Sequence, residues 1–285
     1  MLASEPFIEK EFEIWPGRLL FAAAGDGARE ALDAGMDMAR DVSSALIADA
    51  ELLASGSPDV LPRGQAGRLA LEAHQAVRDA LPVEDLPPAL AALPGAVCDV
   101  VLGAMRERSG AAVTAVWLDG VMALHQDAET MAPSRTGLPP VLHEFSVALG
   151  TGLQGGVAMG GIRSSTPTSG LADLVAVQAR SAGLAGLVAA ALADAVEVVS
   201  AARETGGSRD KLLQMGWAGR RMTGATGLIE PEAVWEALSA AVRRANVLRE
   251  KRLLRAAALG LKGRGRTVGP VDGDRLLRFG VSEWR

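Results

Sequence analysis

The fold of this protein is decided by residues 171–193, whose sequence is LADLVAVQARSAGLAGLVAAALA. The first part, residues 171–179, is mostly apolar and predicts a strand. From Ser181 the composition changes to Ala, Leu and Gly, which predicts an apolar helix that reaches about Arg203. The thirteen residues 181–193 carry no charge, but a bilayer span takes ~20 residues, so we expect a buried helix.

The sequence on both sides of this stretch predicts helices and strands in mixed order. Apolar residues at helical spacing predict further helices over residues 26–53, 64–81, 90–106 and from Pro231 onward. Short or alternating apolar runs predict further strands, two within residues 7–24 and one each over 111–118, 121–124 and 142–149. The dipeptide Asp119-Gly120 lies between two of these strands and is a strong hairpin-turn signal.

This order of elements predicts the fold class. The chain shows no regular alternation of strand and helix, so a parallel sheet of βαβ units is disfavoured. We expect an α+β layered fold with mixed sheets flanked by helices. A chain of 285 residues can bury a sizeable core, and we expect a single domain over residues 1–285. The alternative division is into two packed halves, about 1–110 and 111–285.

Composition and charge narrow the classes of partner. The net charge is −5 and aromatic residues make up only 4%, whereas nucleic-acid binders are usually basic and use aromatic stacking. We therefore expect no nucleic-acid partner and no membrane partner. Cys98 is the one cysteine, which excludes an intramolecular disulfide and favours a reducing compartment. The first residues do not resemble a signal peptide, so we expect a cytoplasmic location.

A glycine-rich run follows the predicted strand 142–149. Gly150, Gly152 and Gly155 match the dinucleotide fingerprint Gly-x-Gly-x-x-Gly. That fingerprint requires a helix immediately afterwards, because the helix N-terminus holds the pyrophosphate. Here the run continues with further glycines up to residue 161, so we expect a glycine-rich turn or flexible loop rather than a dinucleotide site.

The histidines and the cysteine do not form a recognisable metal or nucleophile pattern. His74, His125 and His143 lack metal-ligand spacing, so we predict no metal site. Each is expected to be a satisfied or solvent-facing histidine. His125 is the most interesting, because it lies where a strand enters a long loop. Cys98 lies in an apolar helical stretch and is expected to be buried and inert.

Two segments could bind an anion. Residues 163–170 combine one guanidinium, that of Arg163, with several hydroxyls and nearby glycines. This loop is either a phosphate or carboxylate site or simply a solvated loop. Residues 243–266 contain nine Lys or Arg and one acidic residue, Glu250. A basic patch is one interpretation, and the solvated face of a terminal helix is the one that we favour.

Several segments, in order, resemble the short ApbE-like protein family. They are GIRSS at 161–165 followed by 171–185, LPGAVCDVVLGAM at 93–105, GVMALH at 120–125, and AAALGLKG at 256–263, which the resemblance assigns to a C-terminal helix. The resemblance covers roughly residues 85–265. It implies the fold of the ApbE-type flavin transferases, which bind FAD and Mg²⁺ and transfer FMN to a protein threonine or hydrolyse FAD.

The same resemblance argues against that chemistry in this chain. The family's metal-binding Asp and Thr correspond to Gly186 and Ala190, neither of which offers a side-chain oxygen to a hard cation. The family's Asn-Gly-Gly-Asp element survives only as residues 118–120, and its lysine has no counterpart near residues 94–97. The metal site is degenerate in this comparison, and Mg²⁺ and FAD are disfavoured.

These observations lead to three hypotheses about function. In the first, the protein binds a small anionic molecule in cofactor or small-molecule biosynthesis. Arg163 would anchor the anion, with Ser164, Ser165 and Thr166 beside it, and His125 and Asp119 would be the catalytic groups that handle protons. In the second, the chain is a non-catalytic subunit that completes a partner enzyme, or it forms a homo-oligomer. The third is an FMN transferase with a displaced metal ligand.

Overall fold

The structure is a computed structural model of the chain. It describes residues 7–55, 60–83, 86–127, 140–198, 201, 203–206, 216–217 and 222–272. The main feature is one antiparallel sheet of eight strands, in the order β1-β2-β3-β4-β5-β6-β9-β10. The strands are β1 (Ile8–Ile14), β2 (Gly17–Ala24), β3 (Val113–Leu118), β4 (Val121–Gln126), β5 (Gln154–Gly160), β6 (Leu174–Ala179), β9 (Ala256–Leu261) and β10 (Arg264–Val268). The short strands β7 (Arg203–Thr205) and β8 (Thr223–Thr226) form a separate small sheet.

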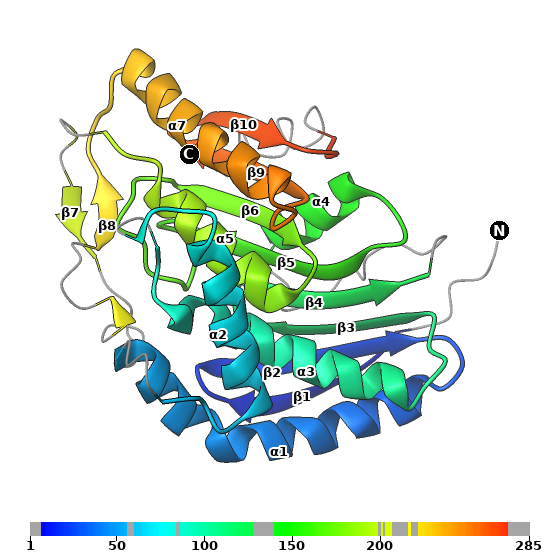
Figure 1. Ribbon diagram of the computed structural model, residues 1–285. Helices are drawn as coiled ribbons and strands as arrows, with labels where there is room; N and C mark the ends of the chain where they lie inside the picture. The colour runs from blue at the N-terminus through cyan, green and yellow to red at the C-terminus, as the bar shows by residue number, and fades with distance from the viewer. Residues whose placement is uncertain are drawn as a thin grey trace.

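Helices lie on both faces of the large sheet, which confirms the predicted α+β class with helices flanking a sheet. One face is covered by α1 (Ala28–Ser55), α2 (Gln65–Arg78), the 3-10 helix η2 (Ala89–Ala92), α3 (Leu93–Glu107), α5 (Ala182–Asp194) and α7 (Pro231–Glu250), as Figure 1 shows. We call this the helix side. The opposite face packs against α4 (Pro140–Leu149).

The predicted hairpins and the long helices are confirmed. The strands β1 and β2 pair around Pro16, and β3 and β4 pair around Asp119 and Gly120. Asp119 has a positive φ of 53°, a conformation that Asp tolerates better than most residues. The apolar helix that begins after Ser181 is shorter than predicted, because α5 ends at Asp194 instead of near residue 203.

Three predictions about secondary structure are wrong. Residues 142–149 belong to helix α4, because Leu142, Phe145 and Leu149 recur at spacings of three and four and pack on the sheet. Most of the glycine-rich run, residues 154–160, is the central strand β5 instead of a loop. Residues 256–261 are β9, not a helix, and pair with β6 and β10.

The glycines of β5 have a packing reason. A Cβ on Gly156 would lie 2.1 Å from the Cα of Ala182, and one on Gly160 would lie 2.5 Å from the carbonyl oxygen of Ala189. Helix α5 therefore lies directly on the backbone of β5, and only glycine allows this approach.

The run Ala89–Glu107 is long and apolar enough to cross a membrane by composition, but 78% of that window is buried inside the protein. It packs against α1, α2, α5 and the strands β3 and β4. This is how a core helix of a soluble protein behaves.

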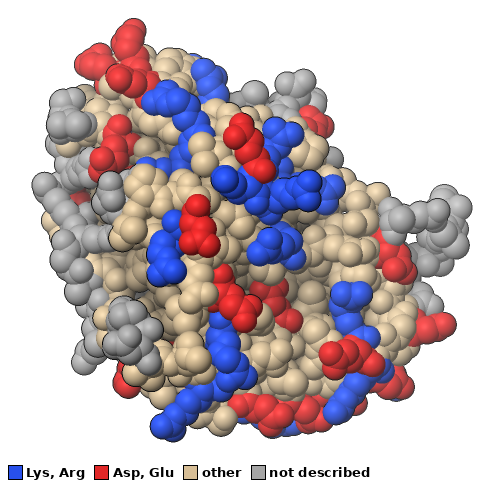
Figure 2. All heavy atoms as spheres, in the orientation of Figure 1, with Lys and Arg blue, Asp and Glu red and all other residues tan. Residues whose placement is uncertain are grey.

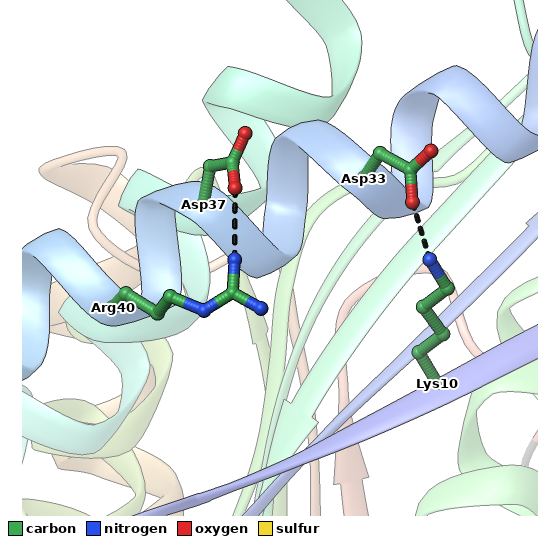
Figure 3. Close-up of polar contacts among 4 residues, drawn as sticks. All are labelled: Lys10, Asp33, Asp37 and Arg40. Atoms are coloured by element: carbon green, nitrogen blue, oxygen red, sulfur yellow. Dashed lines mark hydrogen bonds and ion pairs between the residues drawn. The ribbon is translucent and has the colours of Figure 1, made fainter.

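The outer edge of the sheet at β1 is charged. Lys10 on β1 forms an ion pair with Asp33 on α1, and Asp37 pairs with Arg40 one helical turn further on (Figure 3). Exposed charges on an edge strand disfavour pairing with a second sheet.

Candidate functional site

The strands of the antiparallel sheet end at two opposite borders, and the predicted site residues divide between them. The turn at Asp119 and the loop that carries Arg163 lie at one border, which we call the Asp119 border. His125 lies at the other border, six residues along β4 from Asp119. At about 3.3 Å per residue the two side chains are roughly 20 Å apart. They cannot act on one small ligand together.

The structure brings three predicted residues together at the Asp119 border. Asp119, Ser165 and Thr166 line a small cavity, whose other walls come from Pro16, Val121 and the η2–α3 segment. Its volume is about 10 Å³. A cavity of this size holds one water molecule at most. The arrangement is therefore packed and not open to a cofactor.

The remaining predicted residues of this loop serve the loop itself. The Ser164 hydroxyl lies 2.9 Å from the carbonyl oxygen of Gly161 and 3.0 Å from that of Thr166. The backbone N–H of Arg163 donates to the carbonyl of Asp173 at 3.1 Å. Burial raises the pKa of the Asp173 carboxyl, while the N–H of Lys262 and the charges of Lys262 and Arg163 oppose the rise. The guanidinium of Arg163 thus lies near a carboxyl group of its own chain.

The position of the family's metal ligands is also packed. Gly186 on α5 faces η2, and a Cβ there would lie 3.0 Å from the carbonyl oxygen of Ala91 and 3.6 Å from Val121. Ala190 is almost fully buried one turn later. Within the described residues, no group of three His, Cys, Asp or Glu side chains could hold a metal ion. The residues present do not fit Mg²⁺, because it prefers several oxygen ligands in octahedral geometry.

The larger cleft lies at the opposite border, near His125. Its volume is about 500 Å³, and it is lined by Arg180, Arg249, Arg252 and Arg255, with Gln154 and Leu254 among the residues between them. We call it the arginine cleft. Figure 2 shows Lys and Arg side chains gathered around the C-terminal end of α7 on this face.

Different elements supply the four arginines. Arg180 directly follows β6, and Arg249 lies in the last turn of α7. Arg252 has a positive φ of 59° in the turn after α7. Arg255 directly precedes β9, and its N–H donates to the carbonyl of Gln178 at 2.9 Å. Three element ends and one backbone turn therefore converge on one hollow.

The guanidinium groups of this cleft have no ion-pair partner among the residues that the structure describes. In the part of the chain that the structure describes, none of the four side chains forms an ion pair or a hydrogen bond, and no carboxylate lines the cleft. Arginine stays protonated in proteins, so the four positive charges persist at any physiological pH. Such a hollow attracts anions and can bind oxyanions through paired N–H donors.

The basic run 243–266 does not form the face of one helix, so that interpretation is wrong. It covers the last part of α7, a turn, β9 and part of β10. Some of its residues have other roles: Arg266 and Arg264 lie 4.0 and 5.7 Å from the ring centre of Trp235, and Arg244 donates to the carbonyl of Ala191. The excess of basic residues in 243–266 was the sequence signal for the cleft. Arg180 lies outside that run, and nothing in the sequence indicated that it belongs to the cleft.

His125 lies beside the arginine cleft. It pairs with Thr114 on β3 and with Gln154 on β5, and Gln154 lines the cleft. Its Nδ1 is buried and has no hydrogen-bond partner among the described residues. Burial lowers the pKa of His125, and the charge of Arg106 lowers it further, whereas Asp127 raises it. The imidazole is therefore held neutral near neutral pH.

The other candidates are not among the described lining residues of either place, although Cys98 contacts the carbonyl of Val121 beside the small cavity. Cys98 is fully buried in α3, and burial together with Asp99 raises the pKa of its thiol well above the usual value. Burial and Arg78 lower the pKa of His74 on α2. His143 lies on α4, on the opposite face of the sheet.

Comparison with known protein families gives one match to this chain. A family model described as AbpE bacteria matches residues 9–267, which is more than half of the chain. A search of curated proteins found none that matches this chain.

Proposed function

The chain belongs to the AbpE bacteria family, and we propose that its function is to bind a small molecule with more than one anionic group in the arginine cleft. A role in cofactor or small-molecule biosynthesis, in the cytoplasm, is part of this proposal. The observation that carries it is the convergence of four guanidinium groups, without a described carboxylate partner, on one hollow.

The size and lining of the cleft support a particular class of ligand. A volume of about 500 Å³ falls in the range of small-molecule sites. Each guanidinium can donate two parallel hydrogen bonds to a phosphate or a carboxylate. None of the described lining residues is aromatic, so a flavin or purine ring has no aromatic stacking partner here. A sugar phosphate or an aliphatic polycarboxylate suits the cleft better than a nucleotide.

We also propose that this protein is related to the ApbE-type transferases. We propose that it nevertheless does not carry out Mg²⁺-dependent flavin transfer. Gly186 and Ala190 support this point, because a carboxylate at residue 186 would be pressed against the Ala91 carbonyl. Magnesium-dependent release of FMN from FAD by the purified protein would overturn this part of the proposal.

A matched pair of variants tests anion binding. Arg249 and Arg243 are both exposed on α7, but only Arg249 lines the cleft. We expect Arg249→Ala to weaken binding of pyrophosphate, measured by calorimetry, about tenfold or more, because a hydrogen bond to a charged group contributes ~1.5–3 kcal/mol. Arg243→Ala should change it less than about twofold, since a solvent-screened charge contributes little.

The same measurement distinguishes the alternatives. Equal losses in the two variants would show general electrostatic attraction and contradict a built site. If neither pyrophosphate, sugar phosphates nor citrate binds the wild-type chain, the anion-binding proposal is wrong. A stoichiometric protein that co-purifies with the chain and stabilises it would then favour a non-catalytic subunit.

A further inference from the structure

We propose that His125 belongs to the arginine cleft and takes up a proton from solvent when an anion binds there. This inference rests on the proposed function and deepens it, because it names a proton-linked group in the same site. It also separates His125 from the Asp119 border, with which the sequence alone had grouped it.

The sheet register places His125 next to a lining residue of the cleft. His125 and Gln154 are direct partners across β4 and β5. Val121 and Ala123 point into the helix-side core, and His125 follows them in the alternation of β4. Gln154 has the same relation to Ala158 on β5. Both side chains therefore lie on the helix side, where direct cross-strand neighbours have Cβ atoms about 5 Å apart.

The burial of the imidazole shows which of its edges is open to solvent. Nδ1 is buried, as is the Oγ1 of Thr114, its neighbour on β3. The side chain as a whole is only half-buried. Its accessible edge is therefore the one that carries Nε2. That nitrogen can receive a proton without breaking any described hydrogen bond of the imidazole.

The charges around His125 determine how it responds to an anion. Arg106 on α3 faces it with a positive charge, and Asp127 after β4 faces it with a negative one. Thr114 and Gln154 on the neighbouring strands are neutral, and α5 has no charged side chain before Asp194. In the empty cleft, burial and the charge of Arg106 disfavour an imidazolium.

A bound anion reverses this balance. Its negative charge offsets the guanidinium groups and favours the protonated imidazole. Because linkage is reciprocal, a proton on His125 tightens the binding of the anion by the same factor. The site should thus bind its ligand more tightly in mildly acidic solution.

The test is an NMR titration of the histidine side chains with sulfate, whose charge does not change near neutral pH. Saturating sulfate is expected to raise the pKa of His125 by about half a unit or more, which corresponds to about threefold tighter sulfate binding at low pH. His74 should titrate as it does without sulfate. His125→Gln should abolish the pH dependence of sulfate affinity, whereas the control His143→Gln should keep it.

The outcomes separate this inference from the proposed function. If sulfate binding is lost in Arg249→Ala but the titration of His125 does not respond to sulfate, only the role of His125 is wrong. If the wild-type protein binds pyrophosphate but not sulfate, the inference about His125 is overturned and the proposed function stands. If it binds none of sulfate, pyrophosphate, sugar phosphates and citrate, both proposals fail. If His125→Gln retains the full pH dependence, the proton goes elsewhere and the inference is overturned.

Discussion

The Asp99 carboxylate on α3 accepts a hydrogen bond of 2.8 Å from the backbone N–H of Ala182, the first residue of α5. Its second oxygen accepts from the N–H of Gly183 at 2.9 Å. These N–H groups have no partner within the helix, so Asp99 joins the two core helices at the start of α5. The same contact brings a carboxyl group into a largely buried position, where its ionisation affects stability.

Stability should depend on the ionisation of Asp99. Burial raises its pKa from 3.8 to about 6, although the hydrogen bonds from Gly183, Ala182 and Ser181 oppose the rise. The folded state thus holds the proton more tightly than the unfolded chain. The resulting stabilisation is complete below about pH 4 and is lost as the pH rises through about 6, on the order of 2–3 kcal/mol in all.

Urea unfolding at several pH values tests this expectation. His74 and His125 have lowered pKa values and contribute a slope of the opposite sign. The informative quantity is therefore the difference between wild type and Asp99→Asn. We expect the free energy of unfolding of Asp99→Asn to rise relative to that of the wild type as the pH rises through 6. A difference that does not change with pH would contradict the prediction.

Gly156 should be irreplaceable, because α5 lies on it. The Cβ of Gly156→Ala would be 2.1 Å from the Cα of Ala182, and neither backbone can move without disturbing the sheet. We expect a loss of about 3 kcal/mol or more in the free energy of unfolding. Gly103→Ala is the control, since its Cβ meets nothing within 4 Å on α3. It should gain about 0.5–1 kcal/mol.

Restoring a carboxylate at residue 186 should not restore a metal site. In Gly186→Asp the Cβ would lie 3.0 Å from the Ala91 carbonyl, and the charge would be buried in the apolar core. We expect a loss of several kcal/mol, because an unpaired buried charge is strongly destabilising. Mg²⁺ should not raise the melting temperature of this variant. Rescue by Mg²⁺ would show that oxygen ligands surround the position after all.

The Cys98 thiol should be unreactive in the native protein. It is fully buried, its pKa is raised, and its Sγ lies 3.9 Å from the carbonyl of Val121. We expect an aromatic disulfide reagent to modify it only as fast as the protein unfolds, and readily in denaturant. Rapid modification without denaturant, at native far-UV circular dichroism, would contradict this burial.

Parts of the candidate site were accessible from sequence and parts were not. The excess of basic residues in 243–266 indicated an anion patch, but it did not show that Arg249, Arg252 and Arg255 converge while Arg264 and Arg266 flank Trp235. Arg180 joins them only because β6 ends beside the start of β9. Likewise Asp119 and His125 are close in sequence, but the strand between them holds them apart.

The sequence by itself determined the elements whose signals are local. The helical spacing of α1 and α7, the Asp119-Gly120 turn and the apolar pattern of residues 171–193 were sufficient for these, because each acts within a few turns or strand residues. Only the tertiary structure decided that the glycine run is the strand β5 and that residues 256–261 are β9. Both depend on neighbours distant in the chain: α5 must lie directly on the glycines, and β6 and β10 must pair with β9. The arginine cleft arises in the same way, from element ends that only the register of the sheet brings together.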